Sequence, residues 1–277
     1  MKRNPVLYSV FAIALGVAAT SCKHTEGPSL PTQEVIKDSA KDATVTTLEQ
    51  LISNIPSPME ISKELSKEGV QMNASLLNSP DKASSYSGTM QQAVAMGVYG
   101  ADMGYVISYN NMQQGMQYMA QVAKLAQGLG ITSAYDQKLM DMFKNSASNK
   151  DSIALAVQTA FDQAQKELYS NKRAATSSLV FAGGWVEGLY IATNLIKDEK
   201  NDKNAALYQK IWDHMYAFQY LQQVLTGYKD KNTDCANMLQ TLQPLFDAGA
   251  KLSAGGLSLS DVQKLKDIVT QIRGKLV

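Results

Sequence analysis

Two acidic residues stand alone in long apolar stretches of the sequence. Asp102 and Glu187 each have only apolar, glycine or tyrosine residues for several positions on either side. Each is followed three positions later by a tyrosine, Tyr105 and Tyr190 respectively. A buried carboxylate without a partner is costly, so each acid needs a hydrogen-bond donor, a counter-charge or a proton.

Three interpretations of these acids follow from their setting. The first is a polar pocket or a proton-transfer pair with raised pKa values. The second is an interior hydrogen-bond network that fixes the register of two helices. The third is an exposed pair of charges. Tyrosine hydroxyls, Asn110, Asn194 or lysines are the expected partners. The candidate interior polar or pocket residues are Asp102, Tyr105, Trp185, Glu187 and Tyr190.

Familiar catalytic and metal-binding motifs do not occur in the sequence. There is no Gly-x-Ser-x-Gly elbow, no phosphate-binding loop ending in Gly-Lys-Ser/Thr and no His-Glu-x-x-His. His24 and His214 are the two histidines, and no Glu-x-x-His pair supports a di-iron centre. The sequence therefore predicts no metal and no cofactor, and it assigns no catalytic residue.

The N-terminus has the composition of an export signal. Lys2 and Arg3 precede an apolar stretch over residues 6–19, which is too short to span a bilayer. Small residues then lead directly into Cys22, as in a bacterial lipobox. We expect residues 1–21 to be a lipoprotein signal peptide and Cys22 to carry the lipid. The alternatives are an ordinary signal peptide with a chance cysteine, or a retained membrane helix.

The residues after Cys22 predict a tether and a location. Residues 22–45 are polar and contain glycine and proline, which is typical of a flexible linker, although a packed extended arm is the alternative. Lys23 occupies the position at which an aspartate signals retention at the inner membrane. The expected location is therefore the cell envelope, at the outer membrane, with the periplasmic or surface-facing side left open.

Cys235 is the second cysteine, and it has no partner once Cys22 is acylated. One interpretation is a small apolar packing residue at the start of a helix. The other is a reactive thiol activated by the helix N-terminus.

Apolar residues recur at helical spacing through most of the chain. The pattern predicts an all-α fold, an antiparallel multi-helix bundle of about eight to ten helices. Residues 46–277 are expected to form a single helical domain, with a split near residue 172 as the alternative. Ser260 and Gln263 predict a capping box for the last helix. The expected helices cover residues 47–54, 58–68, 86–109, 112–129, 133–145, 151–170, 176–198, 203–227, 233–251 and 259–276.

Glycines lie inside the helices that carry the two acids. Gly97, Gly100 and Gly104 are in the first helix, and Gly184 and Gly188 are in the second. A glycine inside a helix costs about 1 kcal/mol relative to alanine. Close approach of two helix backbones is the simplest compensation.

Composition excludes several classes of protein. Hydrophobic residues make up 45% of the 277 residues, which is enough for a sizeable core. Two cysteines exclude a disulfide scaffold. The net charge is +1, and the basic residues are spread thinly without aromatic residues between them, so no nucleic acid is expected as a partner.

Several phrases of the sequence resemble a known family. They are Ile55-Pro56-Ser57-Pro58-Met59-Glu60, Leu76-Leu77-Asn78, Gly97-Val98-Tyr99-Gly100-Ala101-Asp102 and Gly183-Gly184-Trp185-Val186-Glu187-Gly188-Leu189-Tyr190. Over residues 48–277 the chain resembles an uncharacterised all-helical lipoprotein family from Bacteroidota-type bacteria. The resemblance implies lipidation and an all-helical body, and it carries over no functional residue except Cys22.

These observations predict a membrane-anchored cell-envelope lipoprotein with a soluble helical domain that binds a partner or ligand. Its partners would be the membrane, through the lipid on Cys22, and an envelope protein or a small-molecule or glycan ligand. One alternative is an envelope enzyme, such as a hydrolase, that uses Asp102 and Glu187. The other is an accessory lipoprotein that binds glycans or small molecules by stacking them on tyrosine and tryptophan.

Overall fold

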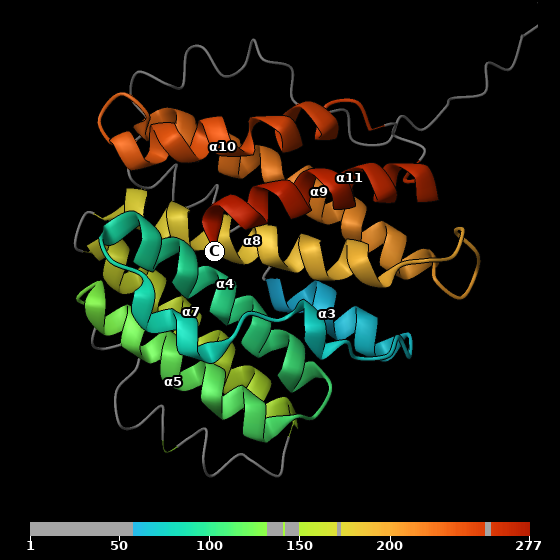
Figure 1. Ribbon diagram of the computed structural model, residues 1–277, viewed down its shortest axis with the longest axis horizontal. Coiled ribbons are helices and arrows are strands. Elements are labelled where there is room, and N and C mark those ends of the chain that lie inside the picture. Colours follow the sequence, from blue (N-terminus) through green and yellow to red (C-terminus); the bar gives the residue numbers. More distant parts are fainter. Residues whose placement is uncertain (1–57, 132–140, 142–149, 171–172, 253–255) are drawn as a thin grey trace, which may run out of the picture.

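The computed structural model describes residues 58–131, 141, 150–170, 173–252 and 256–277. These residues form a bundle of helices joined mostly by short connections (Figure 1). The α-helices are α3 (Pro58–Lys67), α4 (Thr89–Ser108), α5 (Met112–Gly128), α7 (Lys150–Ser170), α8 (Ala174–Leu195), α9 (Ala205–Tyr228), α10 (Thr233–Gly249) and α11 (Leu259–Leu276). Two short 3-10 helices, η1 (Ala74–Leu76) and η2 (Pro80–Ser85), lie between α3 and α4.

The predicted all-α bundle is confirmed, and no strand occurs in the described part of the chain. Each described α-helix begins and ends within about three residues of its predicted range. The predicted helices over residues 47–54 and 133–145 lie outside the described residues. So do the predicted signal peptide over residues 1–21, the predicted lipid site Cys22 and the predicted tether over residues 22–45.

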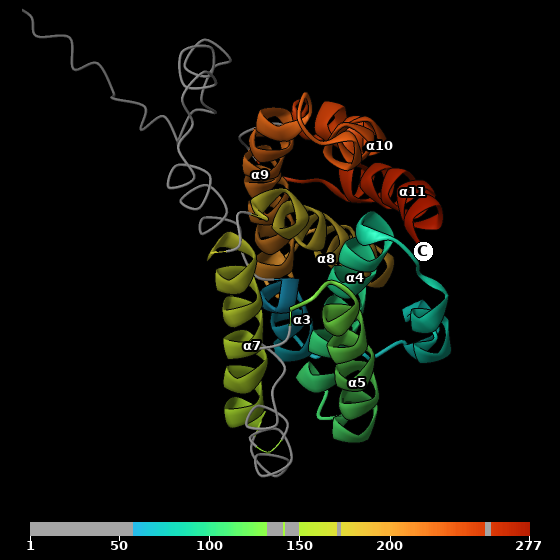
Figure 2. The same ribbon diagram turned by 90° about the vertical axis from the view of Figure 1, so that its left-hand side faces the viewer.

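Helices α4 and α8 form the centre of the bundle. From Ala93 to Ser108 every residue of α4 is buried, and α8 is buried over most of its length. A helix that is apolar on all sides must be surrounded by other elements, and α8 contacts α3, α4, α7, α9, α10 and α11. Figure 2 shows α7 and α5 on opposite sides of α3. No helix in the described ranges has the length and apolar character needed to cross a membrane.

Glycines allow α4 and α8 to approach closely, as the sequence predicted from Gly97 and its neighbours, and Gly183 takes part although the prediction named Gly184 and Gly188 in α8. A Cβ atom added to Gly97 in α4 would overlap the carbonyl of Val180 in α8. In the reverse direction, a Cβ atom on Gly183 would overlap the carbonyl of Val94. Because both obstacles are backbone atoms, no side-chain movement can relieve the overlap. The two glycines therefore set the distance between the helices that carry the two acids.

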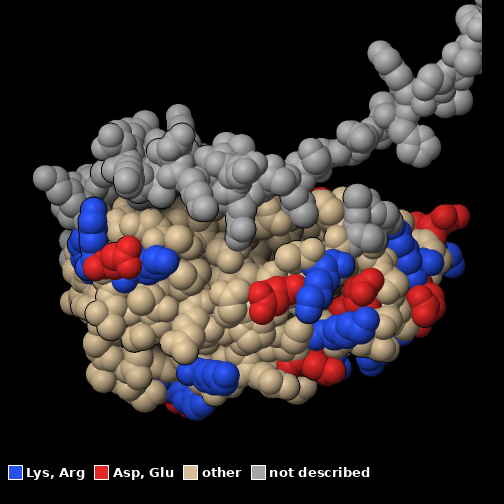
Figure 3. Space-filling model, turned by 90° about the horizontal axis from the view of Figure 1, so that it is seen from above, with Lys and Arg blue, Asp and Glu red and all other residues tan. Residues whose placement is uncertain are grey.

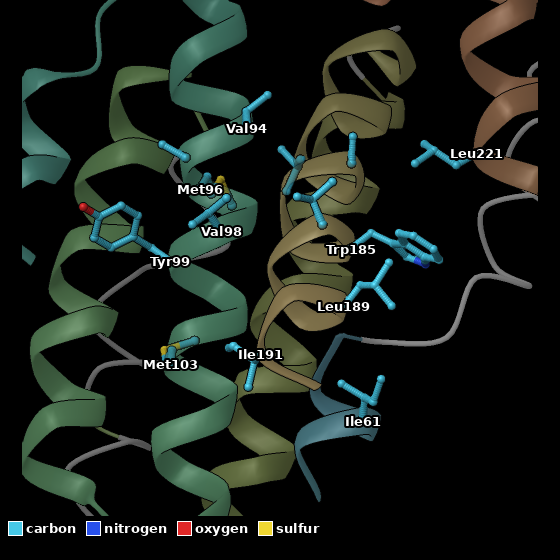
Figure 4. Packing of buried hydrophobic residues seen from close by; sticks show 14 of the residues in the cluster. Ile61, Val94, Met96, Val98, Tyr99, Met103, Trp185, Leu189, Ile191 and Leu221 are labelled. Atoms are coloured by element: carbon cyan, nitrogen blue, oxygen red, sulfur yellow. The ribbon is translucent and has the colours of Figure 1, made fainter. Parts of the chain in front are cut away.

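The outer helices are amphipathic and cover this centre. In α11 the buried positions recur at helical spacing, at Val262, Leu265, Val269 and Ile272. Buried apolar side chains of the described residues form one cluster that extends from Ile61 in α3 to α11. Figure 4 shows part of this cluster, with side chains of α4 and α8 between α5 and α9.

The capping box of α11 lies two residues before the predicted one. The Ser258 Oγ accepts the Asp261 N–H at 3.2 Å, and the Asp261 carboxylate accepts the Ser258 N–H at 3.1 Å. The prediction of Ser260 with Gln263 was therefore wrong. Both pairs have the required spacing, but an acid in the first turn also interacts favourably with the helix dipole.

Candidate functional site

Asp102 and Glu187 come together where α4 packs against α8. Both side chains are completely buried. The charge of Glu187 acts on Asp102, so the two carboxyl groups lie near each other. The structure therefore unites the two acids that the sequence singled out, and the alternative of two exposed charges was wrong.

The counter-charge for Glu187 is Arg273, in the last turn of α11. The Arg273 Nε donates to Glu187 Oε2 at 2.7 Å, and Nη2 donates to Oε1 at 3.0 Å. Two parallel bonds of this kind are a strong geometry for a guanidinium and a carboxylate. The guanidinium also lies over the ring of Tyr190, 4.2 Å from the ring centroid.

Neither of the two asparagines expected to partner the acids binds them. Asn110 lies exposed in the turn between α4 and α5, with a φ of 62°. The side-chain amide of Asn194 donates to the carbonyl of Tyr190 in its own helix, at 2.8 Å. The expectation was wrong because both residues lie close to the helix ends, whereas the acids lie near the middle.

Asn78 donates two hydrogen bonds to Asp102. Its backbone N–H and its side-chain Nδ2 donate to Asp102 Oδ2 at 3.1 and 2.9 Å. The other oxygen, Oδ1, has no N–H or hydroxyl donor among the described residues. A buried oxygen in this position is satisfied if Asp102 is protonated and donates to Glu187.

The electrostatics of the cluster favour this assignment. Burial raises the pKa of Asp102 well above its ordinary value, and the charge of Glu187 raises it further, against the opposing effect of Asn78. Burial also raises the pKa of Glu187, but Arg273 counteracts this through its hydrogen bonds and charge. Of the two acids, Glu187 is therefore the one held as an anion by Arg273, and Asp102 is the one whose neutral form the surroundings favour.

The segment that joins α3 to α4, residues 68–88, covers this cluster. We call it the connecting segment; it lies beside α4 and close to the C-terminus (Figure 2). The carbonyl of Leu76 accepts a hydrogen bond from Arg273 Nη2 at 3.1 Å. Three tyrosine hydroxyls hold other backbone groups of the segment. These bonds join Asn73 N to Tyr105 Oη (2.8 Å), Tyr118 Oη to the Asn78 carbonyl (2.7 Å) and Tyr99 Oη to the Ser79 carbonyl (2.7 Å).

The other candidate residues divide between two places. Tyr190 belongs to the acid cluster through Arg273. Tyr105 anchors the connecting segment and packs edge-to-face with Tyr109, with ring centroids 5.0 Å apart. Trp185 points towards α9 (Figure 4), where it contacts His214 and Phe218. No single pocket therefore contains all five of the predicted residues.

Trp185 lies in a stack of aromatic rings between α8 and α9. Its ring centroid is 3.9 Å from that of His214 and 4.0 Å from that of Phe218, and the rings of both pairs are nearly parallel. Phe246 of α10 extends the stack, 4.3 Å from Phe218. Rings at these distances contribute packing energy beyond the area they bury.

His214 is neutral in this stack. Burial lowers its pKa to about 4, and the carbonyl of Trp185 lies 3.1 Å from its Nε2. Because a carbonyl only accepts hydrogen bonds, Nε2 carries the hydrogen. His214 therefore packs as an uncharged aromatic residue.

Cys235 is buried at the start of α10. Its sulfur lies 3.8 Å from Ser178 Oγ and 3.9 Å from the carbonyl of Ala175. Burial raises the pKa of the thiol to about 11. A protonated, inaccessible thiol supports the packing interpretation and not the reactive one.

Sequence reasoning missed Asn78 and Arg273. Arg273 is one of three arginines in the sequence, against many more lysines. Arginine is the residue that suits a buried, two-bond ion pair, so its rarity was a usable signal. Asn78 carried no comparable signal, because asparagine is common in turns.

The cluster can hold a proton and an ion pair, but it does not have the donor set of a metal site. In the described ranges, no three His, Cys, Asp or Glu side chains gather as metal ligands would. Comparison with known protein families, with characterised protein sequences and with solved structures finds no match to this chain.

Proposed function

We propose that this chain is a lipid-anchored protein of the bacterial cell envelope, whose helical domain binds another envelope component. The observation that carries the anchor is the N-terminal sequence. Lys2 and Arg3, the apolar residues 6–19 and the small residues before Cys22 together match the requirements for export, cleavage and acylation. Multiple acyl chains on Cys22 give firm membrane attachment, whereas one chain alone gives marginal binding.

A binding role fits the acid cluster better than catalysis does. A general acid or base must reach its substrate or a water molecule. Asp102 and Glu187 are both fully buried, and each is occupied by Asn78 or Arg273. We therefore assign the cluster to positioning α4, α8 and α11 and not to a hydrolase reaction.

The glycan alternative depends on exposed aromatic faces. The aromatic row of α9 is only partly exposed and consists of Trp212, Tyr216 and Tyr220. Trp212 and Tyr216 are nearly parallel at 5.4 Å, so each ring covers one face of the other. Because sugars stack on ring faces, this row favours a protein partner over a glycan.

Surface charge gives no preference for a strongly charged partner. On the face shown in Figure 3, basic and acidic side chains lie beside one another in groups, with uncharged surface between the groups. Such a surface has no extended field of one sign to attract nucleic acid.

Mass spectrometry of the chain produced in a bacterial host tests the anchor. We expect the wild type to begin at a fatty-acylated Cys22 and to remain with the membrane fraction. Cys22→Ala should carry no fatty acid and should leave that fraction. Cys235→Ala is the matched control and should behave as the wild type. An unmodified Cys22 at the mature N-terminus, or a chain that keeps residues 1–21 without a lipid, would contradict the proposal.

Cross-linking in intact cells tests the binding role. We expect the wild type to give a defined cross-linked product with another envelope protein, and Cys22→Ala to lose it because the chain is no longer at the membrane. A wild type that cross-links only to lipids or to itself would contradict the binding role without affecting the anchor.

A further inference from the structure

The connecting segment is attached to the helical body by polar contacts and by partly buried apolar side chains, namely Val70, Met72, Leu77 and Tyr86. Most of its residues are exposed, and only Leu76, Asn78 and Ala83 are buried. The bonds that hold it come from three tyrosine hydroxyls, Arg273 and Asp102. A segment with few buried apolar contacts is of the kind that opens locally before the whole domain unfolds.

The central bonds of this attachment end on Asp102, a fully buried carboxyl group whose neutral form burial favours. Asn78 donates two hydrogen bonds to Asp102, which lies against the ionised Glu187. A second negative charge at this place would face one carboxylate and share a single guanidinium, that of Arg273. Water could solvate that second charge only after the connecting segment had lifted away.

We propose that Asp102 and Glu187 form a buried proton-binding site, and that the proton they share locks the connecting segment onto the helical body. Loss of the proton favours the open form, in which the segment separates from α4 and both carboxylates become hydrated. The ligand of this site is the proton. The inference is independent of the lipid anchor and of the proposed partner.

Among the titratable groups around Asp102 and Glu187, Asp102 is the one that changes its charge in this proposal. Glu187 faces it from α8, Arg273 from α11, Tyr118 from α5, Tyr99 from α4 itself and Tyr86 from the connecting segment. Tyr190 of α8 contacts Arg273. Burial raises the pKa values of Tyr86, Tyr99 and Tyr118, so these hydroxyls keep their protons. The hydrogen bonds and charge of Glu187 raise the pKa of Arg273 above its ordinary value despite burial.

The direction of the pH effect follows from the two forms. In the closed form Asp102 keeps its proton at pH values at which a hydrated aspartate has lost it. The closed form therefore binds more protons, and rising pH favours opening. Between the pKa values of the two forms, the opening equilibrium should change by up to about tenfold per pH unit, the slope of one proton.

Hydrogen exchange of the full chain in detergent, measured from pH 5 to pH 9 and corrected for the intrinsic exchange rates, tests the proposal. The reporters are the Asn78 N–H, bonded to Asp102, and the Asn73 N–H, bonded to Tyr105. We expect their protection to fall as pH rises, while the interior amides of α10 show no such trend. A flat profile for both reporters in the wild type would overturn the proposal.

Asp102→Asn removes the proton but keeps the shape of the protonated acid, since an amide can donate to Glu187 and accept from Asn78. We expect both reporters to stay protected over the whole pH range in this variant. Retention of the wild-type slope in a folded Asp102→Asn protein would overturn the assignment to Asp102.

A second variant separates the effect of the segment's hydrogen bonds from the effect of the proton. Tyr118→Phe removes the hydroxyl that holds the Asn78 carbonyl. It should lower protection at every pH and leave the slope unchanged. Tyr208→Phe is the matched control, because it removes a hydroxyl-to-carbonyl bond of equal length, to Asp198, outside the segment. It should leave both reporters unchanged, whereas loss of the slope in Tyr118→Phe would contradict the proposal.

Discussion

Titratable groups are buried on both sides of α8, and they differ in whether they carry a charge. On the side that faces α4 and α11, Glu187 keeps its charge because Arg273 neutralises it with two hydrogen bonds. On the side that faces α9, His214 has no counter-charge in its aromatic stack and stays neutral. Burial alone therefore does not decide whether a titratable side chain is ionised. A paired group keeps its charge, while an unpaired one changes its protonation instead.

Breaking the ion pair should give the largest effect. Arg273→Ala leaves Glu187 buried without a counter-charge, which typically costs about 3–5 kcal/mol of unfolding free energy. Urea unfolding at neutral pH measures the loss. Lys264→Ala is the control on the same helix, since its side chain is 71% exposed, and it should change the free energy by less than about 0.5 kcal/mol. A loss of less than about 1 kcal/mol in Arg273→Ala would mean that Glu187 is not ionised.

The aromatic side should lose stability in acid. The pKa of His214 is about 4 in the folded chain against 6.5 when exposed, so the unfolded chain binds the proton first as pH falls. The wild type should therefore lose about 3 kcal/mol between pH 6.5 and pH 4 through this residue. His214→Phe keeps the stack and should lack this loss in urea unfolding.

His24 is the other histidine of the sequence and provides the control for that measurement. His24→Gln should follow the wild-type pH profile. An acid loss of unchanged size in His214→Phe would show that His214 is already charged when folded, and the contrast between the two sides of α8 would fail.

The close approach of α4 and α8 can be disturbed directly. Gly97→Ala places a methyl group against the Val180 carbonyl and the Gly184 nitrogen, both of them backbone atoms. Overpacking of this kind costs about 1–3 kcal/mol in unfolding free energy. Gly274→Ala in α11 is the control, because a Cβ atom there meets nothing within 4 Å. It should be neutral or stabilise by up to about 1 kcal/mol, and equal effects of the two variants would contradict the close approach.

The smallest effect should come from removing the proton site. Wild-type stability should fall as pH rises above the ordinary carboxyl range, because folded Asp102 keeps a proton that the unfolded chain has lost. Asp102→Asn should remove that fall, so the difference from the wild type should change by at most about 1.4 kcal/mol per pH unit. Exposed Asp267→Asn is the control in the same urea titrations. A difference that does not change with pH would show that Asp102 is ionised in the fold.

Much of the fold and half of the site could be predicted from the sequence. Helical spacing of apolar residues is a local property, so it placed each described helix close to its observed range. The isolation of Asp102 and Glu187 among apolar residues predicted their burial and their need for partners. Periodicity could also have separated Trp185 from Glu187, because residues two apart on a helix point to nearly opposite sides.

Partners from distant parts of the chain could not be predicted in the same way. Arg273 lies in the last turn of the last helix, where a basic residue also has the ordinary role of favouring the helix dipole. Asn78 lies in an irregular segment without periodicity. Whether either reaches the acids depends on how α11 and the connecting segment pack against α4 and α8.

The helices, a close approach of α4 and α8 at glycines, and two acids in an apolar interior all follow from the order of the residues along the chain. These are consequences of local spacing and of the cost of burying charge. The packing of the folded chain brings the acids together, places Arg273 against Glu187 and places Asn78 against Asp102 beneath the connecting segment. Ionisation and hydrogen bonding depend on distances of a few ångströms between side chains, and those distances are set when the whole chain packs.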